Sequence, residues 1–154
     1  MARHAPALLL FARQQAGCEA DAQDLVQEAV VESWRRQSAD APPPLGLVYA
    51  TIRRRAIDLA RRDDRRTDRE LAAHLDSPQC WFDRGLDERE RHLLIHKAMS
   101  HLPPIYRQVV TLKVWGGLTF AEIAEALEIP ANTAASRYRY GLMELRKLAK
   151  EVFA

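Results

Sequence analysis

The sequence contains no apolar run near the roughly 20 residues that a membrane-spanning helix requires. Its start leads only into a short apolar run, so we expect no membrane insertion and a cytoplasmic location. The chain also has only two cysteines, Cys18 and Cys80, and neither belongs to a C-x-x-C pair. This spacing excludes a disulfide framework and a zinc site built from cysteines, and we expect both thiols to be reduced.

Motifs that carry catalytic chemistry are missing as well. There is no glycine-rich phosphate loop and no nucleophile elbow. His92 and His96 are one helical turn apart and form the one tempting pair of metal ligands, but no H-E-x-x-H pattern surrounds them. We therefore expect no catalytic residues, no metal and no cofactor, and we predict that the protein is not an enzyme.

Helical periodicity, in contrast, runs through the whole chain. Apolar residues recur about every 3.6 positions, without the alternation typical of strands. Residues 63–86 are polar, with Trp81 and Phe82 as their apolar anchors. The pattern predicts an all-α fold of two small helical domains, at 1–62 and 87–154, joined by a linker at 63–86.

Proline and glycine mark the expected ends of the helices. In the first domain we expect helices over about 6–15, 21–36 and 47–62, with Asp21 as an N-cap. In the second we expect helices over about 87–101, 104–115, 119–127 and 132–151. The side chains expected to face the first core are Leu25, Val26, Ala29, Val30, Trp34, Leu45, Val48, Ile52, Ala56 and Leu59.

Charged residues are segregated into blocks, although the net charge is only +2. Residues 19–33 carry five carboxylates and no basic side chain, whereas residues 53–69 carry eight arginines against four aspartates. The first block can face a basic partner and the second can face phosphate.

The segment 119–142 has the layout of a helix-turn-helix. Thr119 and Glu122 make a capping box before a short helix. Glu128 stands at the turn position where glycine is usual, and a positive φ there costs about 1 kcal/mol. On the following helix we expect an inner face and an opposite face that is polar and basic. The inner face consists of Ala134, Tyr138, Leu142 and Leu145.

Three stretches resemble a known family, the extracytoplasmic-function sigma factors. The stretch 102–145 resembles region 4, which reads the promoter element near −35. The octapeptide DAQDLVQE at 21–28 resembles the region 2 motif that docks on the clamp helices of the polymerase large subunit. The stretch TIRRRAIDLARR at 51–62 resembles the region 2 helix that captures and melts the −10 element.

The resemblance implies a sigma factor that directs core RNA polymerase to promoters and initiates transcription. The implied polymerase-binding residues are Asp21, Asp24, Gln27 and Glu28. The implied −10 contacts are Tyr49, Arg53, Arg54, Arg55, Arg61 and Arg62. The implied −35 contacts are Asn132, Thr133, Ser136, Arg137, Arg139 and Tyr140. The implied partners are the clamp helices and flap of the polymerase large subunits, promoter DNA and an anti-sigma factor.

Some positions depart from the family pattern. Leu47 stands where a tryptophan is usual in the melting helix, Arg54 where asparagine is common, and Ala135 where lysine is common. Tyr49 is the remaining aromatic residue near the base-capture position. Two other functions stay open: a sigma-like decoy that binds an anti-sigma factor without engaging DNA, and a simple helix-turn-helix repressor. Retention of the basic residues argues against the first, and the motif at 21–28 argues against the second.

Overall fold

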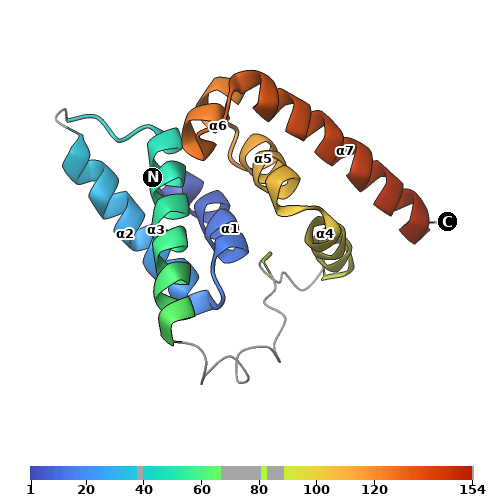
Figure 1. Cartoon of the computed structure of the whole chain (residues 1–154), viewed down its shortest axis with the longest axis horizontal. Coiled ribbons are helices and arrows are strands. Elements are labelled where there is room, and N and C mark those ends of the chain that lie inside the picture. The colour runs from blue at the N-terminus through green and yellow to red at the C-terminus, as the bar shows by residue number, and fades with distance from the viewer. Residues whose placement is uncertain (38–39, 67–80, 83–88, 154) are drawn as a thin grey trace. The chain divides into compact units, whose positions relative to one another are not determined.

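The computed structural model describes residues 1–37, 40–66, 81–82 and 89–153, and within these ranges every regular element is a helix. The chain divides into two compact units, Met1–Gln79 and Cys80–Ala154, each built from its own helices (Figure 1). No helix among the described residues is long and apolar enough to cross a membrane. The prediction of an all-α fold with two helical domains is thus confirmed.

The N-terminal unit is a three-helix bundle preceded by one short turn, η1 (Ala2–His4). Its helices are α1 (Ala5–Gln15), α2 (Glu19–Arg36) and α3 (Leu45–Arg66), and each packs on the other two (Figure 1). The side chains that fill the core come from all three helices: Leu8, Leu10, Phe11, Ala12, Ala22, Leu25, Ala29, Val48, Tyr49, Ile52 and Ala56.

The entry into α2 differs from the expected one. The helix begins at Glu19 with Cys18 as its N-cap, so Asp21 lies inside the first turn. A carboxylate there still interacts favourably with the helix dipole. Glu19 also accepts hydrogen bonds from Nε and Nη2 of the buried Arg13, at 2.8 and 2.9 Å. This two-pronged ion pair ties the end of α1 to the start of α2.

The inner face of α2 was predicted only in part. Leu25 and Ala29 are buried, but Trp34 is 42% exposed and Ser33 is buried in its place. The buried residues at this end of α2, Ala29 and Ser33, are small, as close packing between helices favours. The expectation that Trp34 belongs to the core is therefore wrong.

The C-terminal unit contains α4 (Arg89–His101), α5 (Pro104–Val114), α6 (Phe120–Leu127) and α7 (Ala131–Phe153). The long α7 packs on the other three helices, and α5 also packs on α6. Two glycines end α5. A Cβ on Gly116 would lie 2.6 Å from the carbonyl oxygen of Leu112, and Gly117 has a φ of +66°. The close contact leaves no room for a Cβ at position 116, and a side chain at the positive φ of position 117 would cost about 1 to 2 kcal/mol, so both positions favour glycine.

Residues near both ends of the predicted linker at 63–86 belong to the helical units. Its first four residues continue α3 to Arg66. Near its other end, Trp81 packs against the buried cluster of Met99, Leu102 and Val110. Phe82 lies against Trp115, with ring centroids 5.6 Å apart. The rest of the predicted linker, with Cys80 and the helix start at Asp87, lies outside the described residues.

Candidate functional site

The outer face of α2 carries the acidic residues that the sequence singled out. Asp24, Gln27 and Glu28 are exposed, and Asp21 is partly exposed. Their spacing of three and four residues places them on one side of the helix. The exposed Val31 and Trp34 continue the same side toward the end of α2. The result is a surface of carboxylates followed by two apolar side chains.

Arg55 of α3 reaches across to this surface. Its Nη1 lies 2.7 Å from Oε2 of Glu28, and its Nε lies 2.8 Å from Oε2 of Glu32. Glu32 is paired a second time, because its Oε1 lies 2.6 Å from Nη2 of Arg36. The structure thus joins Glu28 and Arg55, two residues that the resemblance had assigned to different partners.

A small cavity of about 170 Å³ lies beside this bridge, between α2 and α3. Residues of both predicted groups line it: Asp21, Asp24, Leu25, Glu28, Arg55, Asp58, Leu59 and Arg62. Polar and charged atoms dominate its wall, as expected for a surface that meets a charged partner rather than an apolar ligand.

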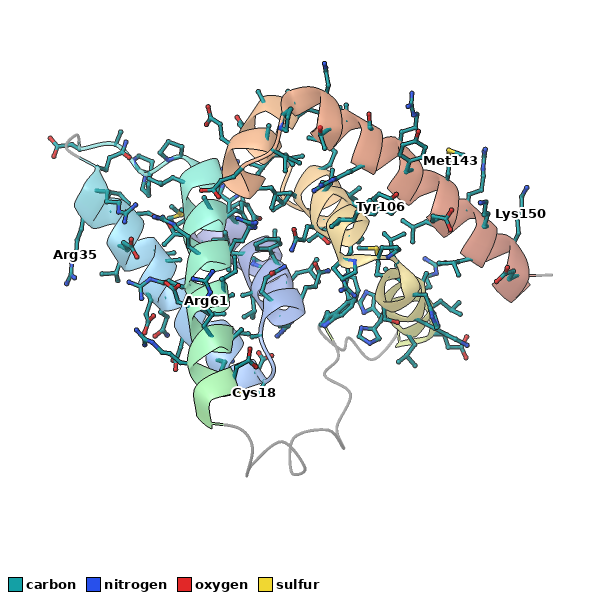
Figure 2. The ribbon with its side chains drawn as sticks, viewed as in Figure 1. Cys18, Arg35, Arg61, Tyr106, Met143 and Lys150 are labelled. Carbon is teal, nitrogen blue, oxygen red and sulfur yellow. The ribbon has the colours of Figure 1, made fainter. Side chains whose placement is uncertain are left out.

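The other arginines of α3 are placed differently from Arg55. Arg54, Arg61 and Arg62 are exposed, and Arg53 is half-buried. Figure 2 labels Arg61 on α3 and the exposed Arg35 on α2. Arg54 donates a hydrogen bond of 3.2 Å from Nη2 to Oγ1 of Thr51. These side chains form a basic surface along α3 that is open to a polyanion.

Tyr49 does not belong to that surface. It is 1% exposed, and its ring meets Phe11 edge to face at a centroid distance of 5.4 Å. Burial also raises the pKa of Tyr49 to about 12. A ring enclosed in this way cannot stack on an unpaired base, so the −10 contact expected of Tyr49 is withdrawn. The sequence of α3 alone could not reveal this, because the covering residue comes from α1.

The helix-turn-helix of the C-terminal unit follows the predicted local geometry. The Glu122 backbone N–H donates to Oγ1 of Thr119 at 3.2 Å, and the Thr119 N–H donates to Oε2 of Glu122 at 3.0 Å. Glu128 ends α6 with φ 56° and ψ 47°, the left-handed conformation. The capping box and the non-glycine turn are both confirmed.

The first turns of α7 hold the residues predicted to read DNA. Asn132, Arg139 and Tyr140 are exposed, whereas Thr133, Ser136 and Arg137 are partly exposed. Within this set, the Ser136 hydroxyl donates to the carbonyl oxygen of Asn132 at 2.9 Å. The guanidinium of Arg139 lies 5.4 Å from the centre of the Tyr140 ring. The start of α7 therefore presents two arginines, an aromatic ring and three short polar groups on one surface.

An apolar groove of about 450 Å³ crosses the C-terminal unit. Its walls come from three helices and include Leu94, Ile95, Met99, Val110, Val114, Leu142, Leu145 and Leu148. Leu142 lies at its rim and is 41% exposed, so the prediction that it faces the core is wrong. Figure 2 shows Met143 and Lys150 projecting from α7. Helical periodicity predicts which apolar residues share one face of a helix, but it cannot distinguish a face that fills a core from a face that lines an open groove.

The two histidines on α4 pack against aromatic rings. His92 stacks on Phe82 at 6.1 Å, and His96 meets Trp81 edge to face at 4.6 Å. Burial and the nearby charge of Arg107 lower the pKa of His96. Across the described part of the chain, no three His, Cys, Asp or Glu side chains come together in a way that could hold a metal ion.

Each of the two units matches a known protein family. Residues 1–66 match Sigma-70 region 2, and residues 92–145 match Sigma-70, region 4. The ECF RNA polymerase sigma factor SigK of Mycobacterium ulcerans is 30% identical over 131 residues, which cover 80% of this chain and 70% of that protein. SigL of Mycobacterium tuberculosis is 29% identical over 157 residues, which cover 97% of this chain and 86% of that protein.

Two solved structures share the fold. The sigma factor RpoE from Bartonella quintana, in complex with the anti-sigma factor NepR, has a TM-score of 0.70 and 21% identity. That match covers 97% of this chain and 93% of RpoE. CnrH, in complex with the cytosolic domain of CnrY, has a TM-score of 0.65 and 22% identity, with 97% and 84% covered.

Proposed function

This chain belongs to the extracytoplasmic-function (ECF) RNA polymerase sigma factors and directs RNA polymerase in transcription initiation, and we propose how its described surfaces divide that work. The face of α2 docks on the polymerase, the arginines of α3 meet the −10 element, and the start of α7 meets the −35 element. In this proposal the polymerase carries out the catalysis and this chain does not. Because the chain works on the polymerase, we also propose that it is located in the cytoplasm. The single observation that carries this proposal is that exposed carboxylates gather on α2, whereas exposed or partly exposed arginines gather on α3 and at the start of α7.

Docking on the polymerase is assigned to Asp21, Asp24, Gln27 and Glu28. Their carboxylates and amide suit a basic coiled coil such as the clamp helices of the large subunit, because complementary charge guides encounter and fixes register. The exposed position of Asp24 means that it contributes only about 0.3 to 1 kcal/mol to its own helix. A variant at this position should therefore report on docking rather than on folding.

The variant Asp24→Arg tests this assignment. It should weaken binding to core polymerase strongly in a pull-down, while the circular dichroism spectrum keeps its helical form. The matched control is Asp40→Arg, the same charge reversal at an exposed residue between α2 and α3. Undiminished binding of Asp24→Arg to core enzyme would remove this residue from the docking surface.

Promoter contacts are assigned to two sets of residues. On α3 they are Arg53, Arg54, Arg61 and Arg62, which can track phosphates or stack on an unpaired base. On α7 they are Asn132, Thr133, Ser136, Arg137, Arg139 and Tyr140. The α7 set lies where a helix-turn-helix presents its second helix to the major groove.

Alanine variants of Arg137 and Arg139 test the −35 assignment in holoenzyme on duplex promoters at several salt concentrations. Loss of a phosphate contact should weaken binding to all sequences and lower the salt slope by about 0.9. Loss of a bidentate guanine contact should cost about 1 to 3 kcal/mol on the cognate site only. Arg146→Ala, an exposed arginine later on α7, is the control. Wild-type behaviour of both variants on every template would favour the decoy function instead.

The apolar groove is assigned to a protein partner. Its open shape and its leucine-rich wall suit an amphipathic helix, and we assign it to the flap of the polymerase large subunit. An anti-sigma factor is a second candidate partner of this chain, because RpoE and CnrH were both solved with a bound protein partner, and RpoE's is an anti-sigma factor.

A further inference from the structure

Arg55 differs from its neighbours on α3 in what it touches. Its side chain is 37% exposed and contacts two carboxylates of another helix, Glu28 at 2.7 Å and Glu32 at 2.8 Å. Arg54, the next residue, donates a hydrogen bond to the hydroxyl of Thr51 on its own helix. The guanidinium of Arg55 thus binds Glu32, 23 positions earlier in the sequence, and Glu28, 27 positions earlier. Charge-assisted bonds from the planar guanidinium to two separate acceptors fix the orientation of both.

Glu32 anchors this arrangement from the inside. Its side chain is 23% exposed, against 56% for Glu28, so it is the less solvated of the two carboxylates. Burial alone would raise the pKa of Glu32, but the hydrogen bond from Arg55 and the charges of Arg36, Arg55 and Arg54 outweigh it and lower that pKa. Glu32 is therefore ionised at neutral pH. Arg55 is held by Glu32 and in turn holds Glu28, which lies further out.

This geometry makes Arg55 a poor candidate for a phosphate contact. To bind a phosphate through two parallel hydrogen bonds, its guanidinium would have to release Glu28 or Glu32, and release of Glu32 would leave that partly buried carboxylate with Arg36 alone. A phosphate approaching Arg55 would also meet the negative charges of Glu28 and Asp24 on the same surface, which line one cavity with it. Arg54 and Arg61, by contrast, are not among the residues that line this cavity.

We propose that Arg55 is a positioning residue for polymerase docking, which holds Glu28 in its docking orientation through the bridge to Glu32, and is not a promoter contact. This inference rests on the proposed docking role of α2. It assigns a function to the bridge between α2 and α3 and moves one arginine from the DNA-binding set to the polymerase-binding side.

Whether removal of Arg55 strengthens or weakens binding to core polymerase distinguishes a positioning role from an effect of its charge. Removing Arg55 makes the docking face more negative, so charge alone would speed association with a basic partner and tighten binding. Loss of positioning acts in the opposite direction, because Glu28 would then sample several rotamers and the complex would separate faster. The expected result for Arg55→Ala is dissociation from core polymerase about fivefold faster, with an association rate that is equal or higher.

The experiment measures association and dissociation of the full chain on immobilised core polymerase, for wild type, Arg55→Ala and four further variants. Arg55→Lys should recover part of the loss, because one ammonium can satisfy one carboxylate but not both in the same fork. Glu32→Gln should reproduce the faster dissociation of Arg55→Ala. The double variant should be no worse than either single one, because both break the same bridge. Arg54→Ala is the matched arginine and should instead lower promoter affinity.

A second measurement uses holoenzyme assembled at saturating protein, so that weaker docking no longer matters. Promoter affinity per assembled complex should be unchanged in Arg55→Ala and reduced in Arg54→Ala. Reduced promoter affinity of Arg55→Ala, or tighter binding to core, would overturn the inference. If Asp24→Arg fails to weaken core binding, the docking role of α2 is itself wrong. If only Arg55→Ala fails to do so, the docking role stands and the positioning role falls.

Discussion

Helices α5 and α7 cross at Gly141. Whether Gly141→Ala raises or lowers the free energy of unfolding depends on how closely the two helices pack there. A Cβ at position 141 would lie 2.8 Å from Cγ2 of Val110 and 3.4 Å from Cβ of Tyr106. Val110 is fully buried, and as a β-branched residue in a helix it has essentially one χ1 rotamer. The added methyl group therefore has no easy way to displace its neighbour.

Two opposing contributions set the magnitude for Gly141→Ala. Replacing a helical glycine by alanine stabilises by about 1 kcal/mol. Forcing an extra carbon into a packed crossing costs about 1 to 3 kcal/mol. We expect the clash to win, with a net loss of about 1 kcal/mol in the free energy of unfolding of this unit. In a Val110→Ala background the space is vacant, so the same substitution should stabilise by about 1 kcal/mol.

The assay is hydrogen exchange of the α5 and α7 amides in wild type, the two single variants and the double variant, since it reports on this unit independently of the other. The double-mutant cycle should give a coupling of about 2 kcal/mol between positions 110 and 141. Stabilisation by Gly141→Ala in the wild-type background would refute the close crossing. An equal loss in both backgrounds would show that the cost does not come from Val110.

Three further predictions concern single side chains. Leu142→Glu at the rim of the groove should weaken core binding, whereas Met143→Glu, equally exposed but outside the groove, should not; both are measured by pull-down. Tyr49→Phe should keep or raise the melting temperature, because its buried hydroxyl finds no hydrogen-bond partner among the described residues. The C-terminal unit should lose stability as the pH falls from 6.5, the ordinary pKa of histidine, toward the lowered pKa of His96, because protonation favours the unfolded chain. Melting curves of His96→Gln should show less of this loss.

Much of the helical framework could be predicted from local patterns. The capping box at Thr119 and the left-handed turn at Glu128 follow from residues within one turn of each other, and both are present. The proline at 104 and the glycines at 116–117 mark the limits of α5 correctly. Local chemistry of this kind is decided within the segment itself, so sequence reasoning reaches it.

The faces of the helices were harder to predict, for a reason visible on α2. Its buried positions include Ala22, Ala29 and Ser33, whereas the large Trp34 is exposed. Sequence reasoning favours bulky apolar residues for the core, but close helix packing selects small ones. Tyr49 shows the same limit, since only the arrival of Phe11 from α1 buries it. The bridge from Arg55 to Glu28 and Glu32 also depends on tertiary placement.

The length of α7 has a mechanical consequence. It is one helix of 23 residues, which spans about 35 Å, and Gly141 lies near its middle. Residues before the crossing face the expected DNA, and residues after it line the apolar groove. A tilt of about 10° about Gly141 would move the first turn, about 15 Å away, by about 2.6 Å. That displacement is enough to break a hydrogen bond. A partner in the groove that tilts α7 about this crossing would therefore displace Asn132 and Thr133 at the other end of the helix.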